Sequence, residues 1–144
     1  MSARVVTAAR GWIGTPYLHQ ASVRGVGTDC LGLLRGVWRE VVGPEPEPVP
    51  PYTADWDEAA RAEVLAQAAA RWLRPVPAGQ EGEGQALLFR MRSDAVAKHL
   101  GISARRDGME TFIHAYNGHG VVESPLSAPW ARRIVARYSF PIQE

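Results

Sequence analysis

Hydrophobic and polar positions change their spacing near Pro77 in this chain of 144 residues. Before Pro77 the apolar residues recur every three or four positions, which is the spacing of an amphipathic helix. After it they alternate with polar residues, which is the spacing of a half-buried strand. Helices followed by a run of short strands indicate an α+β fold, and the length predicts a single domain over residues 1–144.

The first half of the chain predicts three helices. One spans residues 2–12 and begins with a serine that can cap it. The second spans residues 29–42, with Asp29 as its N-cap and an apolar stripe along one side. The third spans about 56–74. Between the second and the third, residues 43–52 contain five prolines, which exclude a helix and predict an extended strap.

The second half predicts five short strands in one antiparallel sheet. The turns between them contain Asp107–Gly108 and Asn117–Gly118, two dipeptides that favour tight hairpins. The predicted strands are residues 85–91, 98–105, 111–117, 120–126 and 132–140.

The hairpin at Asp107–Gly108 brings two histidines together. A two-residue turn there places Gly101 opposite His114, and His99 opposite Tyr116. Opposed residues share a face of the sheet, so His99 and His114 become diagonal neighbours with Cβ atoms less than about 7–8 Å apart. A register slip of one residue would instead place the two histidines on opposite faces.

The only cysteine of the chain, Cys30, lies at the start of the second predicted helix. The thiolate is the nucleophilic form, and a helix N-terminus or a nearby imidazolium lowers the thiol pKa from about 8.5. With His99 as general base and His114 as the orienting group, Cys30 would complete a nucleophile–base–orienter triad. The backbone N–H of Cys30 and the Tyr17 hydroxyl are candidate donors to an oxyanion.

Other interpretations of these residues stay open. Cys30 could be a buried structural thiol, and the two histidines could meet on the sheet by chance. A zinc site could use His99, His114 and His119 with Cys30 or Asp29, although His114 and His119 are separated by a turn and are not expected to share a face. The cysteine chemistry requires no cofactor.

Composition limits the class of protein. The formal net charge is +1 and the arginines are scattered, so we expect no nucleic-acid partner. No apolar run reaches the roughly 18 residues of a membrane span. The N-terminal residues lack the apolar core of a secretory signal, which predicts synthesis in the cytoplasm without a signal peptide.

Four motifs, taken in order, resemble the NlpC family of cell-wall cysteine peptidases. The resemblance covers roughly residues 8–42 and 85–125, and it implies a papain-like fold. It assigns the nucleophile to Cys30, the base to His99 and the orienting group to His114, and it places Tyr17 beside the nucleophile. The motifs are GTPY at 14–17, TDCLGL at 28–33, KHLGI at 98–102 and FIHAY at 112–116.

The resemblance implies hydrolysis of an amide bond in the peptide stem of peptidoglycan, commonly between D-glutamate and the diamino acid. Three features depart from the family pattern. Leu31 stands where serine is usual, residues 17–22 replace a glycine-rich segment, and residues 43–76 lengthen the interval between nucleophile and base. With the compact size, these features are similar to peptidases in the tails of phages and phage-derived gene transfer agents. That similarity implies phage-like tail proteins as partners and action in the periplasm or cell wall.

Two other functions are compatible with the same residues. A structural tail component could have kept the fold without catalysis. An acyltransferase could use the same acyl-enzyme chemistry with a different acceptor. Asp29 could cap its helix or contact substrate, His19 could line the groove, and His119 is expected to be exposed. The strap could serve as a lid or as a docking surface.

Overall fold

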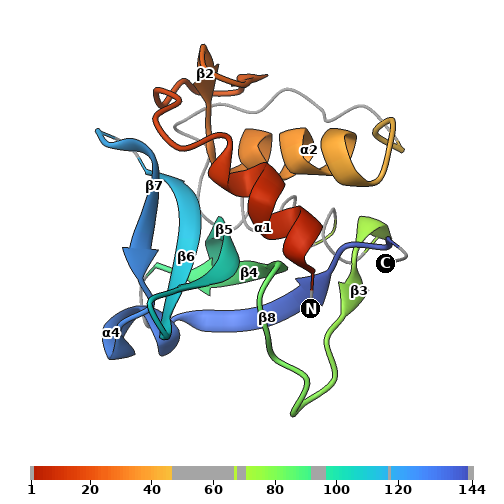
Figure 1. Ribbon diagram of the computed structural model, residues 1–144, viewed down its shortest axis with the longest axis vertical. Helices are drawn as coiled ribbons and strands as arrows, with labels where there is room; N and C mark the ends of the chain where they lie inside the picture. The colour runs from red at the N-terminus through yellow and green to blue at the C-terminus, as the bar shows by residue number, and fades with distance from the viewer. Residues whose placement is uncertain (1, 47–66, 68–70, 92–96, 117, 143–144) are drawn as a thin grey trace.

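The computed structural model describes residues 2–46, 67, 71–91, 97–116 and 118–142. In Figure 1, helices α1 and α2 lie together on one side of a curved sheet. The elements are α1 (Ala3–Arg10), β1 (Ser22–Val23), β2 (Gly27–Thr28), α2 (Cys30–Val41), β3 (Arg74–Pro75), β4 (Gln85–Arg90), β5 (Ala97–Arg106), β6 (Met109–Tyr116), β7 (Gly120–Pro125), α4 (Ala128–Ala131) and β8 (Ile134–Ser139). The predicted α+β class, with a mainly antiparallel sheet, is confirmed.

Both predicted N-terminal helices form, and each begins after the predicted cap. The Ser2 hydroxyl accepts a hydrogen bond from the Val5 N–H at 3.2 Å. The Asp29 carboxylate accepts one from the Gly32 N–H at 2.8 Å. Such caps satisfy N–H groups that the first helical turn leaves without an intrahelical partner. The start of α2 is therefore determined by a local signal.

Most of the predicted strap and third helix lies outside the described residues. The predicted helix end at residue 74 is two positions too late, because residues 74 and 75 form β3. The described start of the strap is held against α2, where Glu45 accepts hydrogen bonds from Arg35 at 2.7 Å and Arg39 at 3.0 Å. The described helical residues of this part are Gln67, Arg71 and Trp72.

All five predicted strands form, but the prediction of a five-stranded sheet is wrong. Within the described parts of the chain the sheet has six strands, in the order β3-β8-β4-β5-β6-β7. The added strand β3 pairs with β8 at the edge of the sheet. A strand of two residues that includes a proline has no alternating pattern, so the hydrophobic pattern does not reveal it. A separate small sheet of β1 and β2 precedes α2 (Figure 1).

The β5–β6 hairpin has the predicted register. Arg106 pairs with Met109, and Ile102 pairs with Ile113. The two turn residues, Asp107–Gly108, have φ values of 54° and 79°. Positive φ at both positions is what a two-residue hairpin turn of type I′ requires. The alternation of side chains along β5 and β6 is fixed as a consequence.

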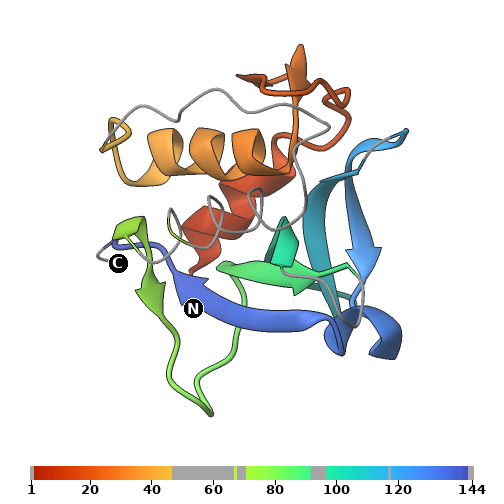
Figure 2. The ribbon, with the colours of Figure 1, turned by 180° about the vertical axis from the view of Figure 1, so that it is seen from behind.

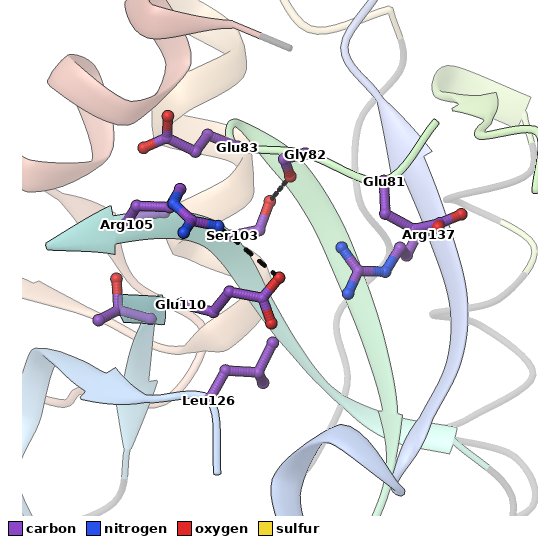
Figure 3. A pocket seen from close by; sticks show the side chains of 10 residues that line it. Glu81, Gly82, Glu83, Ser103, Arg105, Glu110, Leu126 and Arg137 are labelled. Atoms are coloured by element: carbon purple, nitrogen blue, oxygen red, sulfur yellow. Dashed lines mark hydrogen bonds and ion pairs between the residues drawn. The ribbon is translucent and has the colours of Figure 1, made fainter. Parts of the chain in front are cut away.

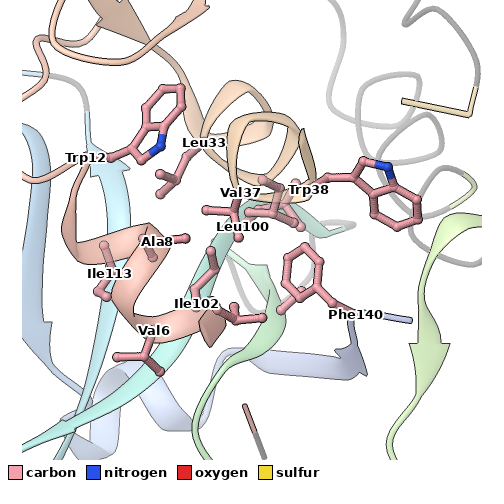
Figure 4. Packing of buried hydrophobic residues seen from close by; sticks show 14 of the residues in the cluster. Val6, Ala8, Trp12, Leu33, Val37, Trp38, Leu100, Ile102, Ile113 and Phe140 are labelled. Atoms are coloured by element: carbon pink, nitrogen blue, oxygen red, sulfur yellow. The ribbon is translucent and has the colours of Figure 1, made fainter. Parts of the chain in front are cut away.

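Helices α1 and α2 cover one face of the sheet and form the main core (Figure 4). Leu100 and Ile102 of β5 point into this core, together with Ile113 of β6. Gly36 lets Trp12 approach α2 closely, because a Cβ at position 36 would lie 2.0 Å from the Trp12 ring. The helix that begins with the cysteine is thereby held at a defined position above β5 and β6.

A smaller apolar cluster occupies the opposite face of the sheet. It consists of Leu87, Phe89 and Phe112, packed with Trp130 of α4. Because side chains alternate along a strand, the residues next to Leu100 and Ile113 point toward this second cluster. The predicted histidines are among them.

A buried carboxylate fastens α1 to the sheet. Glu123 of β7 accepts two hydrogen bonds from Arg10 at 3.0 Å and one from the Thr111 hydroxyl at 2.6 Å. Arg106 donates a further bond at 3.0 Å. Burial raises the pKa of Glu123, but the hydrogen bonds and the two arginine charges outweigh it, so the pKa is lowered. The carboxylate therefore stays ionised and holds α1 against β7.

Candidate active site

Cys30 is the first residue of α2; it forms no disulfide, and its side chain is half-buried. Its side chain and that of Tyr17 both pack at the margin of the main core. The neighbouring Leu31, where the resembled family usually has serine, is buried in that core. A thiol in the first turn of a helix experiences the partial positive charge of the N-terminus, which favours the thiolate.

Asp29 ties the segment after Tyr17 to the start of α2. One carboxylate oxygen caps the helix, and the other accepts a hydrogen bond from the Gln20 N–H at 2.8 Å. Gln20 has a φ of 65°, which is unusual for a residue other than glycine, and this bond holds the turn in place. His19 Nδ1 lies 3.9 Å from the second oxygen. The predicted capping role of Asp29 is confirmed.

The two histidines of the predicted triad are hydrogen-bonded to each other. His99 Nε2 and His114 Nδ1 are 2.9 Å apart, and the ring planes are inclined by 79°. Only 8% of His99 and 2% of His114 is exposed. Gly101 lets the side chains of β6 lie close to β5, since a Cβ at position 101 would lie 3.1 Å from the Phe112 ring and 3.4 Å from the Cβ of His114. The prediction that they are neighbours on one face is confirmed.

Aromatic rings surround the histidine pair. The His114 ring centroid lies 4.1 Å from that of Phe112 and 5.6 Å from that of Trp130. The His99 ring lies 5.8 Å from Phe89 and 6.0 Å from Trp130. The sequence did not single out Trp130, which reaches the pair from the short helix α4. These rings exclude water from the hydrogen bond between the imidazoles.

His114 also contacts a residue that the sequence did not single out. Its Nε2 lies 3.0 Å from the hydroxyl oxygen of Ser124 on β7. Both ring nitrogens of His114 are therefore engaged, one by His99 and one by Ser124. Ser124 is opposite Phe112 in the β6–β7 pairing. An alternating pattern alone could have placed it on this face, but not at this register.

The pKa of His114 is lowered from 6.5 to about 4. Burial is the main cause, and the charge of His119 contributes the rest of the shift. His119 is exposed and stacks on Tyr116, with ring centroids 5.2 Å apart. At neutral pH His114 is consequently uncharged. A neutral imidazole has one N–H and one lone pair. Neutral His114 can therefore accept a hydrogen bond from His99, and it adds no positive charge that would oppose protonation of His99.

The lowered pKa of His114 predicts a specific loss of stability in acid. Protonation is hindered in the folded state, while the unfolded chain binds the proton near pH 6.5, so stability falls as the pH drops from about 6.5 toward 4. Between pH 7.5 and pH 5 this amounts to about 2 kcal/mol. Urea unfolding at the two pH values should show that loss in wild type and a smaller one in His114→Gln. An equal pH dependence in both proteins would contradict the assignment.

The histidine pair lies at one particular end of the sheet. Strand β5 begins two residues before His99, β6 ends at Tyr116, and β7 begins at Gly120. The strands are antiparallel, so these three positions lie at the same end. Figures 1 and 2 show the first turn of α2 on the side of β6 and β7, and its last turn on the side of β3.

Backbone hydrogen bonds join this end of the sheet to the start of α2. Val121 of β7 accepts a bond from the Gly14 N–H at 3.0 Å and donates one to the Thr15 oxygen at 2.9 Å. The next residues pair with β2, where the Thr28 N–H donates to the Pro16 oxygen at 3.0 Å. Thr28 lies two positions before the cysteine. The segment 14–28 thus brings the first turn of α2 to the end of the sheet that carries the histidines.

The structure groups the predicted residues in two sets at that end. Tyr17 forms a backbone bridge with Thr28, next to Asp29 and Cys30. His99 and His114 form the second set. Catalysis by the full triad remains a proposal.

The described residues contain no group of three or more histidine, cysteine, aspartate or glutamate side chains placed to hold a metal ion. The zinc alternative would need His114 as a ligand. Both nitrogens of that ring already have hydrogen-bonding partners in His99 and Ser124. The arrangement is suited to fixing which nitrogen of each histidine ring carries the hydrogen.

A pocket of about 120 Å³ lies at the other end of the hairpin (Figure 3). Ser103 borders it and donates a hydrogen bond to the Gly82 oxygen at 2.6 Å. Arg105 and Glu110 also line it, and their side chains are largely exposed. Arg105 Nη1 lies 4.0 Å from Glu110 Oε1. None of the predicted site residues lines this pocket, so it is separate from the candidate site.

No family model matches the sequence, and no curated protein matches it. Solved structures do match. An NLP/P60 family protein described as similar to lipoprotein, from Staphylococcus aureus subsp. aureus Mu50, aligns with a TM-score of 0.60 and 17% identity, over 97% of this chain and 41% of that chain. An NlpC/P60 family protein from Bacillus cereus ATCC 10987 aligns with a TM-score of 0.64 and 15% identity, over 95% of this chain and 39% of that chain.

These likenesses concern the fold. The chain spans about two fifths of the length of each of the two solved proteins. Among the described residues, no helix is long and apolar enough to cross a membrane. The chain has the fold of NlpC/P60 proteins, an antiparallel sheet with a small number of helices.

Proposed function

We propose that this protein is a cysteine peptidase that hydrolyses an amide bond in the peptide stem of peptidoglycan. The observation that carries the proposal is the buried, hydrogen-bonded pair of His99 and His114 at the end of the sheet where α2 begins with Cys30. The NlpC/P60 fold and the four sequence motifs support the same function.

The chemistry follows the charges of the site. His99 takes the proton of the Cys30 thiol, and the thiolate attacks the carbonyl carbon of the scissile amide. The resulting oxyanion is held by the backbone N–H of Cys30 and by the Tyr17 hydroxyl. The C–N bond then breaks, and the leaving amine takes the proton from His99.

A water molecule completes the reaction. His99 removes a proton from the water, which attacks the thioester formed on Cys30. The C–S bond breaks, the thiolate is released and reprotonated, and the new product end is a carboxylate. Throughout, neutral His114 accepts a hydrogen bond from Nε2 of His99. This bond keeps the other ring nitrogen of His99, Nδ1, directed at the thiol.

The finer assignments rest on the sequence resemblance. We propose the bond between D-glutamate and the diamino acid as the one cleaved. We further propose a role in the tail of a phage or gene-transfer-agent particle, with phage-like tail proteins as partners, in which the enzyme acts in the periplasm or cell wall and opens the wall locally. The same departures from the family pattern, at Leu31, residues 17–22 and residues 43–76, support this part.

A digest of diaminopimelate-type peptidoglycan tests the proposal. Because the chain has a single cysteine, iodoacetamide treatment supplies a control that is modified at one thiol only. We expect new fragments that end at D-glutamate, seen by mass spectrometry, with untreated protein and not with the alkylated protein. Fragments carrying a transferred acyl group would indicate an acyltransferase instead. An unchanged digest, together with an unreactive Cys30, would favour a structural tail component.

A further inference from the structure

We propose that Ser124 is a positioning residue, whose hydroxyl accepts a hydrogen bond from His114 Nε2–H and so stabilises, in the buried site, the tautomer of His114 that supports His99 as a base. This inference deepens the proposed function and rests on it. Ser124 lies on β7, one strand beyond His114 and two beyond His99.

The contacts form a continuous line of three side chains. Ser124 Oγ lies 3.0 Å from His114 Nε2, and His114 Nδ1 lies 2.9 Å from His99 Nε2. His114 is 2% exposed, whereas Ser124 is half-buried. The His114 ring therefore exchanges hydrogen bonds with a partner at each end and has almost no contact with solvent.

Hydrogen atoms along this line can be arranged in two ways. If His99 is to take the thiol proton at Nδ1, its own hydrogen must be on Nε2, which then donates to His114 Nδ1. The hydrogen of neutral His114 is then on Nε2 and faces Ser124, whose oxygen accepts it. In the reverse arrangement Ser124 donates to His114, His114 donates to His99, and His99 is left with a hydrogen on Nδ1. That form of His99 cannot take the thiol proton.

Ser124 makes the first arrangement available in a buried site, because its oxygen can accept the Nε2–H of His114. A buried N–H without an acceptor costs the full desolvation of that group. Without the Ser124 oxygen, His114 could avoid an unpaired Nε2–H only by moving its hydrogen to Nδ1, where His99 accepts it. The change would convert His99 to the inactive tautomer. The neutral state of His114 at pH 7, which its lowered pKa ensures, is what makes this choice between tautomers available.

Nitrogen NMR of the histidine rings tests the tautomer directly. Long-range ¹H–¹⁵N correlation spectra of ¹⁵N-labelled protein at pH 7.5 distinguish ring nitrogens that carry hydrogen from those that do not. The chain has four histidines, and single-histidine variants assign their signals. We expect hydrogen on Nε2 of His114 in wild type. A hydrogen on Nδ1 in wild type would overturn the proposal without any mutant.

Two Ser124 variants and a matched control extend the test. Ser124→Ala should shift His114 toward the Nδ1–H tautomer, and Ser124→Thr, which keeps the hydroxyl, should retain the wild-type spectrum. Ser127→Ala is the control, because Ser127 is also near the end of β7 but makes no side-chain capping bond. An unchanged His114 tautomer in folded Ser124→Ala would contradict the proposal.

The kinetic result separates positioning from mere structural support. We expect Ser124→Ala to lower kcat roughly three- to ten-fold with KM nearly unchanged, and Ser124→Thr to restore kcat. A loss of kcat in Ser124→Ala that is not restored by Ser124→Thr and is not accompanied by a tautomer shift would indicate a structural role. If wild type hydrolyses no peptidoglycan, the proposed function fails, but the NMR spectra still decide the role of Ser124.

Discussion

Replacing Cys30 with alanine should abolish peptidoglycan hydrolysis, with a fall in kcat of at least about three orders of magnitude. The thioester cannot form without the sulfur, and no other cysteine can replace it because the chain has only one. The side chain is half-buried at the first turn of α2, so its truncation should lower the free energy of unfolding by less than about 1 kcal/mol.

Initial rates of fragment release, measured by chromatography, and a urea unfolding curve would establish both parts of this expectation. Ser22→Ala offers a comparison close in space, since the Ser22 hydroxyl bonds to the Gly32 oxygen of α2 rather than acting in the chemistry. Turnover by Cys30→Ala within ten-fold of wild type would exclude this residue as nucleophile. Rapid alkylation of wild type at pH 6, faster than that of free cysteine, would show independently that the thiol pKa is lowered.

Replacing His99 with alanine should lower kcat more than replacing His114. General base catalysis contributes roughly 10²–10⁴-fold, and His99 is assigned that role. His114 only orients the base, and we expect roughly a ten- to hundred-fold loss in its absence, because His99 can still reach the thiol in part of its conformations. We expect this difference because, in the proposed mechanism, only His99 exchanges a proton with the thiol.

The comparison requires folded variants, so near-UV circular dichroism should accompany the kinetics. His114→Gln retains a hydrogen-bonding group in the buried site and avoids the cavity that alanine would create. Exposed His119 provides the matched control, and His119→Ala should leave kcat within about two-fold of wild type. Equal losses for the two buried histidines, or a greater loss at His114, would mean that their roles are exchanged.

Local signals in the sequence were sufficient for the elements that form the candidate site. The cap residues Ser2 and Asp29 predicted where the first two helices begin, because a cap acts within one helical turn. Asp107–Gly108 predicted the β5–β6 register, because a type I′ turn leaves no freedom in the pairing. The contact between the two histidines followed from that register.

Elements without a local signal were not predictable. Strand β3 exists only because β8 offers an unpaired edge, and its two residues contain no pattern of their own. The β6–β7 register was likewise undetermined, because Tyr116 pairs with Gly120 across a loop longer than two residues. Ser124 and Trp130 could therefore not be placed beside His114 from the sequence.

By itself the sequence determined the α+β class, the helix that begins with Cys30 and the contact between the side chains of His99 and His114. Each depends on interactions between residues that are near in the chain, or that one tight turn brings into register. Only the tertiary structure decided the sixth strand, the aromatic surroundings of the histidines and the contact of Ser124 with His114. It also decided that the cysteine helix begins at the histidine end of the sheet, through backbone bonds between residues 14–28 and β7. Those features depend on which distant segments pack together, and a local pattern contains no information about that choice.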